Sequence, residues 1–450
     1  MTTDESRAAG DMTATTTATA TATAPERETT APLWRNRSYR LLLTGATAED
    51  VGAAVGAFAV PLLAYAVTGS VVQAGVIAFV GQLGSVLLTL PAGVIVDRVD
   101  RRRLIMVGST VAALAWTSVV VAGLADGLSV TAPHLAGALF VSSVVGALMD
   151  PAGTAALHAV VPKEQLGQAM SVAQGRDAAA TLLQGPLGGL LYGMSTVLPF
   201  AVSAAGRLVS VVATSLVREP LNGDLDAARA EHPAAALREG LRYVFGVPLL
   251  RASLWLFMLV NVVLNGMMVA INLHLVSTGT APALIGLINT AVGVGVLLGS
   301  VLAGVLVRRV RVGVLTVLTL GVSGVAVVLM AVFPTYWGFV AALTGMMFFA
   351  PALNAGMLSY VTAITPGQMQ GRMAATMGLT GLVAGPAAPL VGSVLLASLG
   401  IGPAMWLFAG AWTVLFLAMF LVRPLWRVGL PGTWAADVVE WPTTRTPSAT

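Results

Sequence analysis

The apolar residues of this chain fall in long runs, which short polar or charged connections separate. The run from Leu104 to Leu124, for example, contains no charged residue. An α-helix needs about 20 such residues to cross the roughly 30 Å hydrocarbon core of a bilayer. The pattern therefore predicts twelve membrane-spanning helices, at about residues 41–67, 71–96, 104–124, 135–159, 168–192, 197–217, 252–276, 283–307, 312–332, 337–360, 373–398 and 402–422.

Composition agrees with a membrane protein and narrows the chemistry. Of the 450 residues 56% are hydrophobic and 10% charged, and the mean hydropathy is +0.85, whereas an ordinary soluble domain has about 25% charged residues. The runs are longer than the roughly 10-residue strands of a membrane barrel, so the fold class is all-α. The chain has no cysteine, and its four histidines are scattered singly. We therefore expect no disulfide, no metal site and no cofactor.

Enzymatic and ATP-driven chemistry is not expected either. The sequence offers no nucleophile and base at matching depth, and no phosphate-binding loop of the G-x-x-x-x-G-K-S/T type. The lack of a nucleophile–base pair argues against an enzyme, and the lack of a phosphate-binding loop argues against a primary pump.

The arginines predict the orientation of the chain. The connections that follow odd-numbered spans contain no Lys or Arg, whereas the other connections and both tails contain many, such as Arg101 to Arg103. Positively charged loops stay in the cytoplasm, so we expect a multi-pass protein of the cell (inner) membrane with both termini cytoplasmic. This bias also accounts for the pI of about 9.8, so nucleic-acid binding is not expected.

The order of these segments predicts five parts. Residues 1–39 are rich in Thr and Ala and are predicted to be a disordered cytoplasmic tail. Two six-helix halves, 40–217 and 251–423, flank a cytoplasmic linker, 218–250, in which residues 234–245 can form a short amphipathic helix. Residues 424–450 form a second cytoplasmic tail, and both tails are too short for an ordered soluble domain.

The two halves contain similar sequence segments. Residues 92–100 (AGVIVDRVD) match residues 303–311 (AGVLVRRVR) at six of nine positions. A second repeated segment is Pro186-Leu187-Gly188-Gly189, which is similar to Pro389-Leu390-Val391-Gly392 at nearly the same offset. Chance similarity between Gly- and Val-rich helices is the alternative. Two parallel six-helix pseudo-repeats with a cavity between them suit alternating access.

The segment after the second span, Gly93 to Arg102 (GVIVDRVDRR), resembles the loop signature G-x-x-x-D-R-x-G-R-R of the major facilitator superfamily. Asp100 stands where the family usually has Gly. Together with Thr68-Gly69-Ser70 and the segment 237–243 (LREGLRY), it is similar to the branch that contains macrolide-efflux and enterobactin-exporter proteins. The resemblance implies the major facilitator fold, proton-coupled export, and a cavity lined by spans one, four, seven and ten.

The loop signature also has a physical interpretation. Gly93 allows a neighbouring helix to approach, and Asp97 can cap or ion-pair with a helix across the contact between the halves. The resemblance implies a conformational role for this loop, whose residues are Gly93, Asp97, Arg98, Arg101 and Arg102. Simple anchoring at the anionic leaflet is sufficient for the arginines alone.

Two adjacent acids, Glu49 and Asp50, lie in the first span at about 14 Å from its start. A charge in hydrocarbon costs about 2.5–3.5 kcal/mol on insertion scales, so we expect these acids to couple protons or to contact substrate. Glu49 shares a face with Gly45, Gly52 and Gly56, where a second helix can approach closely. The alternative is that one acid pairs with an arginine and only holds two helices together.

Further charges lie inside the predicted membrane region. Asp150 and Arg176 are each thirteen residues from Lys163, so they are expected at similar depth and can form an ion pair. This pair is either structural or breaks and re-forms during transport. Asp177 and Arg207 are also buried charges, and for Arg207 we favour a structural partner or a water-filled rim over substrate binding.

Polar and helix-bending residues complete the candidate set. Asn261, Asn265 and Asn272 share one face of the seventh span and form either a cavity wall or hydrogen bonds between helices. In the fifth span Gly185, Pro186, Gly188 and Gly189 resemble the family's G-P-x-x-G-G antiporter motif, one residue short, and predict a helix kink.

The sequence therefore predicts a secondary active transporter that exports a small amphipathic molecule, such as a drug, an antibiotic or a siderophore, by proton antiport. Its expected partners are this substrate, protons and the lipid bilayer, and we expect a monomer. A proton-coupled nutrient importer is the alternative within transport. A non-transporting membrane sensor or scaffold is the alternative from another class.

Overall fold

The computed structural model describes residues 32–125, 129–222, 241–366, 370–422, 426 and 428–437. Within these ranges the chain forms long helices at every predicted span and no strand. The helices are α1 (Arg37–Thr68), α2 (Val71–Arg98), α3 (Arg101–Leu124), α4 (Ala132–Val160), α5 (Leu166–Met194), α6 (Leu198–Ser215), α9 (Pro248–Ser277), α10 (Pro282–Arg309), α11 (Val312–Val332), α12 (Tyr336–Ile364), α13 (Gln370–Leu399) and α14 (Ile401–Leu421). The predicted bounds agree with these to within four residues.

Ten of these twelve helices are long and apolar enough to cross a membrane by length and hydropathy, counted over the described residues. The exceptions are α5 and α13. The first carries Arg176 and Asp177 among several polar residues, and the second contributes only the shorter apolar stretch Gly385–Leu399. Both helices nevertheless pack along their neighbours within the bundle, so the twelve-helix membrane fold is confirmed.

Local sequence signals explain where the helices begin and end. The side chain of Asn36 accepts a hydrogen bond from the N–H of Tyr39 and caps α1. At the other end of α1, Gly69 adopts a φ of 61°, a left-handed conformation that glycine allows without steric cost. The next residue, Ser70, caps α2, so two residues complete the turn between two membrane helices.

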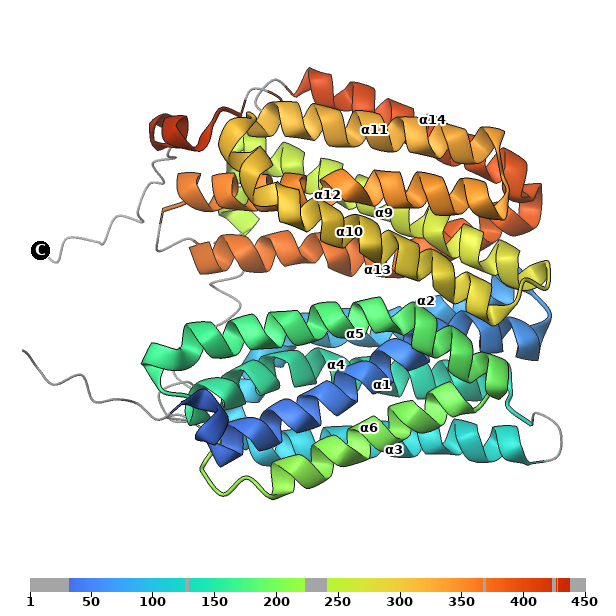
Figure 1. Cartoon of the computed structure of the whole chain (residues 1–450), viewed down its shortest axis with the longest axis vertical. Helices are drawn as coiled ribbons and strands as arrows, with labels where there is room; N and C mark the ends of the chain where they lie inside the picture. The colour runs from blue at the N-terminus through green and yellow to red at the C-terminus, as the bar shows by residue number, and fades with distance from the viewer. Residues whose placement is uncertain are drawn as a thin grey trace, which may run out of the picture.

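The helices form two halves with matching contacts (Figure 1). In the first half α2 packs on α4, α3 on α6 and α1 on α5. The corresponding pairs in the second half, α10 on α12, α11 on α14 and α9 on α13, also pack together. The same order of contacts in both halves confirms the two pseudo-repeats that the repeated sequence predicts.

The halves touch mainly toward one end of the bundle. We call the end where α1 begins and residues 428–437 lie the terminal end, and the opposite end the distal end (Figure 1). Near the distal end the backbone of Gly185 on α5 lies against Gly286 on α10, and a Cβ on Gly189 would lie 3.1 Å from the Cα of Ala283. By contrast, a Cβ on Gly93 or Gly304, near the terminal end, would meet no atom of the described residues within 4 Å. The structure is therefore closed at the distal end.

The end of the described chain packs on the second half. The N–H of Gly313 donates to the carbonyl of Val428 (3.0 Å), and the rings of Tyr360 and Trp434 lie 5.6 Å apart. Residues 1–31, 223–240 and 438–450 lie outside the described residues, and so does most of the predicted amphipathic helix at 234–245. Of that helix, residues 241–245 are described, and they are helical.

Candidate functional site

The two adjacent acids of α1 point to different helices, because neighbouring residues of a helix lie about 100° apart around its axis. Glu49 faces α6, where its Oε1 lies 2.7 Å from Nη1 of Arg207. Asp50 faces α5, where its Oδ2 lies 2.7 Å from Nε of Arg176. The pair of acids therefore forms two separate ion pairs within the first half.

The Glu49–Arg207 pair is buried, with side chains 13% and 6% exposed. The second guanidinium nitrogen of Arg207 donates to Ser142 on α4 (3.1 Å), and Ser109 on α3 donates to Glu49 (3.3 Å). Trp116 also donates to Ser142 (3.0 Å). The pair thus joins α1, α3, α4 and α6 and has the contacts of a structural interaction.

Close helix packing brings this pair together. A Cβ on Gly52 would lie 3.0 Å from Cα of Ser203 on α6, and one on Gly45 would lie 3.1 Å from Cβ of Ala213. The predicted approach of a second helix to the glycine face of α1 is therefore confirmed, and Glu49 lies on that face.

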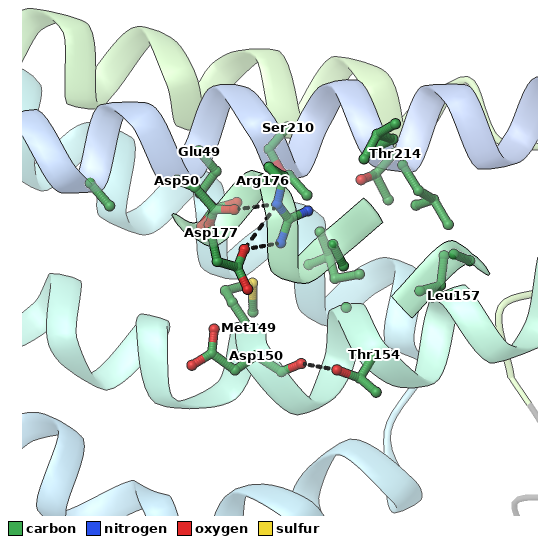
Figure 2. Close-up of a pocket in the computed structure, with 18 of the residues that line it drawn as sticks. Glu49, Asp50, Met149, Asp150, Thr154, Leu157, Arg176, Asp177, Ser210 and Thr214 are labelled. Carbon is green, nitrogen blue, oxygen red and sulfur yellow. Dashed lines mark hydrogen bonds and ion pairs between the residues drawn. The ribbon is translucent and has the colours of Figure 1, made fainter. Parts of the chain in front are cut away.

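The Asp50 pair belongs to a more open cluster, which Figure 2 shows. Arg176 is shared between Asp50 and Asp177, whose Oδ1 lies 2.9 Å from Nη2 of Arg176. The three side chains are 34% (Asp50), 20% (Arg176) and 61% (Asp177) exposed. One guanidinium therefore contacts two carboxylates at the edge of an open space.

The prediction of an ion pair between Asp150 and Arg176 is wrong. Arg176 contacts Asp50 and Asp177 instead, and no described residue forms an ion pair with Asp150 within 4.0 Å. Counting from Lys163 gave a depth, but it did not give the direction in which each side chain leaves its helix. Asp150 still lies beside the same open space as Arg176 (Figure 2).

That open space is a cavity of about 320 Å³ inside the first half. It extends from the charged cluster in the middle of the bundle to Tyr39 and Leu157, near the terminal end. Its lining comes from α1, α3, α4, α5 and α6. The resemblance implied a cavity between spans one, four, seven and ten, so α1 and α4 agree, whereas α9 and α12 do not line this cavity.

The three asparagines of α9 are also not among the residues that line it. Each donates its side-chain amide to the carbonyl four residues earlier, as Asn261 does to Phe257 (2.8 Å) and Asn265 and Asn272 do at the same distance. These amide groups therefore donate within α9, and among the described residues they form no hydrogen bond to a neighbouring helix.

The loop signature contacts the linker of its own half. Arg101 pairs with Asp97 (3.3 Å) and donates to the carbonyl of Leu221 (3.1 Å), and Arg102 donates to the carbonyl of Glu219 (2.9 Å). The expected approach of a helix to Gly93 is not found among the described residues, because a Cβ there would meet none of their atoms within 4 Å. The loop therefore fastens the linker in this conformation.

Asp100, which replaces the family's usual glycine, caps α3. Its carboxylate accepts the N–H of Arg103 (2.8 Å) and the side-chain amide of Asn222 (2.9 Å). The hydrogen bond from Arg103 is the main cause that lowers the pKa of Asp100 below its ordinary 3.8. Arg98 lies at the end of α2.

The glycines of α5 make close contacts between helices. Gly185 and Gly189 meet α10 of the second half, and a Cβ on Gly188 would lie 2.6 Å from the ring of Phe58 on α1. Pro186 lies inside the continuous helix Leu166–Met194. A kink there stays a prediction, and the packing role of the glycines is an addition to it.

Sequence reasoning missed several residues of this site. Tyr39 and Met149 line the cavity, and Ser142 joins the Arg207 network. A single serine or tyrosine carries no periodic signal in an apolar helix, so only its partners in space identify it.

The fold and the site together define a membrane protein with two pseudo-repeated helical halves, a closed distal end and a charged internal cavity, which are features of a secondary transporter. The sequence model of the Major Facilitator Superfamily matches residues 42–279 and 262–447, so this chain belongs to that family.

Two curated relatives and one solved structure illustrate the likeness. The chain is 28% identical over 362 residues to the multidrug efflux pump Tap of Mycolicibacterium fortuitum, which covers 77% of this chain and 86% of Tap. It is 26% identical over 286 residues to the enterobactin exporter EntS of Salmonella choleraesuis (strain SC-B67), which covers 62% and 67%. The crystal structure of a bacterial homologue of the iron transporter ferroportin, in an inward-facing state, aligns with a TM-score of 0.68 at 18% identity, over 87% of this chain and 99% of that one.

Proposed function

We propose that this chain exports a small amphipathic molecule, of the drug or siderophore type, in exchange for protons. The export direction is supported by the curated relatives, a multidrug efflux pump and an enterobactin exporter. The arginine bias of the loops supports a cell-membrane location with both termini in the cytoplasm. In that orientation the terminal end faces the cytoplasm, and the cavity is open to substrate from inside the cell.

The observation that carries the proton step is the sharing of Arg176 between Asp50 and Asp177. When Asp50 takes up a proton, Arg176 keeps a carboxylate partner, so no unpaired cation is left inside the membrane. When Glu49 takes up a proton, buried Arg207 loses its only ion-pair partner among the described residues. We therefore assign proton exchange to Asp50 and a structural role to Glu49.

Proton flux in vesicles tests this assignment. Everted membrane vesicles that contain the protein are energised, and a pH-sensitive dye reports proton movement when antibiotics, dyes and siderophores are added in turn. We expect substrate-driven proton release, which Asp50→Asn abolishes. Glu164→Gln is the matched control, because Glu164 is an exposed acid outside the cavity, and it retains the flux.

Flux that is unchanged in Asp50→Asn would contradict the proton assignment. Export is tested by the same panel in growing cells. Protection of the cells that a protonophore removes supports export, whereas proton-driven uptake of a nutrient would favour the importer.

A further inference from the structure

The charges around the cavity are unequal in number. Four carboxylates, of Glu49, Asp50, Asp150 and Asp177, line the cavity together with the guanidinium groups of Arg176 and Arg207. When all are ionised the site carries a formal charge of −2. The second half adds no negative charge, because residues 251–423 contain no Asp or Glu.

Asp150 is the carboxylate that these arginines leave unpaired among the described residues. Thr154 donates to its backbone carbonyl (3.0 Å), so that hydrogen bond does not involve the carboxylate. Figure 2 shows the Asp150 side chain apart from the group formed by Asp50, Arg176 and Asp177. Asp150 is an exposed residue at the cavity, so a cation that enters the cavity can reach its carboxylate.

A second, independent feature also indicates a ligand. The Tyr39 side chain lines the same cavity and is 1% exposed, yet its hydroxyl has no hydrogen-bond partner among the described residues. A buried hydroxyl without a partner costs free energy that a bound polar group can recover. Tyr39 lies eleven residues before Asp50 on α1, or about 16 Å along the helix.

The cavity also has apolar lining, beside polar residues such as Thr154, Gln174 and Thr214. Leu42, Leu43, Ile105, Met149 and Leu157 line the cavity. Leucine and methionine side chains accept apolar groups of varied shape. A ligand that fits has a cationic group and an apolar body.

We propose that this cavity binds amphipathic organic cations, with the cationic group at Asp150 and a hydrogen-bonding group at Tyr39. This inference rests on the proposed export function and specifies its substrate class. A metal ion fits less well, since no group of three or more His, Cys, Asp or Glu among the described residues is placed to hold one. Mg²⁺ and Ca²⁺ need several converging oxygen ligands.

Two ions of similar size and shape but opposite charge test the proposal. Equilibrium binding of tetraphenylphosphonium and tetraphenylborate is measured on the purified full chain in lipid nanodiscs, without a proton gradient. We expect saturable binding of the phosphonium and at least about tenfold weaker binding of the borate. Equal affinity for the two ions, or tighter binding of the borate, overturns the proposal.

Variants then locate the cation. Asp150→Asn is expected to weaken phosphonium binding at least about tenfold, whereas Asp150→Glu keeps most of it. Glu164→Gln, outside the cavity, leaves it unchanged. Tyr39→Phe weakens binding of ethidium, which has amino groups that can hydrogen-bond, and leaves phosphonium binding unchanged. Wild-type affinity of Asp150→Asn for the phosphonium overturns the site.

The outcomes separate this inference from the proposed function. If an Asp150→Asn preparation does not fold, the comparison of the two ions on the wild-type chain still decides the charge preference. Charge-selective binding together with unchanged proton flux in Asp50→Asn supports the site and contradicts proton coupling. Proton-coupled export without charge-selective binding supports the function and overturns the cation site.

Discussion

The buried pair of Glu49 and Arg207 gives a prediction for stability. Glu49→Gln removes one charge and keeps the shape of the side chain, so it leaves the Arg207 guanidinium, 6% exposed, without its carboxylate. Two unit charges about 4 Å apart attract by about 4 kcal/mol at an effective dielectric constant of 20. Removing one partner of a buried pair costs about 3–5 kcal/mol. We therefore expect Glu49→Gln to lower the free energy of unfolding by about 3–4 kcal/mol, because the hydrogen bond to Ser142 remains.

A double-mutant cycle measures this pair directly. Unfolding in mixed micelles is followed at pH 7 for the wild type, Glu49→Gln, Arg207→Gln and the double variant. We expect the double variant to recover most of the loss, since it contains no unpaired charge. Glu164→Gln on the exposed surface should lie within about 0.5 kcal/mol of the wild type. A loss below about 1 kcal/mol in Glu49→Gln, or additive single effects, would refute a structural role for the pair.

Two further predictions follow from contacts elsewhere. A side chain at Gly185 would overlap the backbone carbonyl of Gly286, so Gly185→Leu should prevent closure of the distal end and stop transport, whereas Gly304→Leu, whose Cβ meets no described atom within 4 Å, should retain transport; unchanged transport in Gly185→Leu would contradict a need for this closure. Asp100→Ala should cost about 1 kcal/mol of unfolding free energy at pH 7 through loss of the cap. The pKa of Asp100 is lowered on folding, so its contribution to the free energy of unfolding is complete above the ordinary pKa of 3.8 and disappears as the pH falls through the folded pKa. The stabilities of the wild type and Asp100→Ala should therefore converge in acid. A difference in stability that stays constant with pH would argue against the cap.

The helices could be predicted from the sequence because each membrane span carries its own hydrophobic signal. Residues 104–124 needed no information about the rest of the chain, and α3 ends at Leu124 as expected. The charged and polar span α5 lacks this strong signal in hydropathy. It is nevertheless predicted, at residues 168–192, as one of the apolar stretches between polar connections.

The site was only partly predictable, because spacing along the chain gives the depth of a residue in the membrane but not the direction in which its side chain points. The position of Glu49 on a glycine face indicated that a helix would approach, and α6 does approach there. Which of the arginines it would meet depended on the rotation of α6, which the spacing along the chain does not give. For the same reason Arg176 was assigned to Asp150 and contacts Asp50. Helices of almost uniform hydrophobicity have weak amphipathic patterns, so their rotation is set by packing.

The location of the ion pairs bears on how the two halves can move. Glu49 with Arg207, and Asp50 with Arg176, are pairs within the first half. Rocking of rigid halves therefore leaves both pairs intact by itself, and in the proposed cycle the Asp50–Arg176 pair breaks only when Asp50 takes up its proton. The contacts that rocking must separate are those between α5 and α10 and between α2 and α13 at the distal end. At Gly185 and Gly286 these are backbone contacts without side chains, so they can part without exposing a buried charge. In the proposed transport cycle a proton or a cation acts on the cavity of the first half, and the glycine contacts then determine how easily the distal end opens.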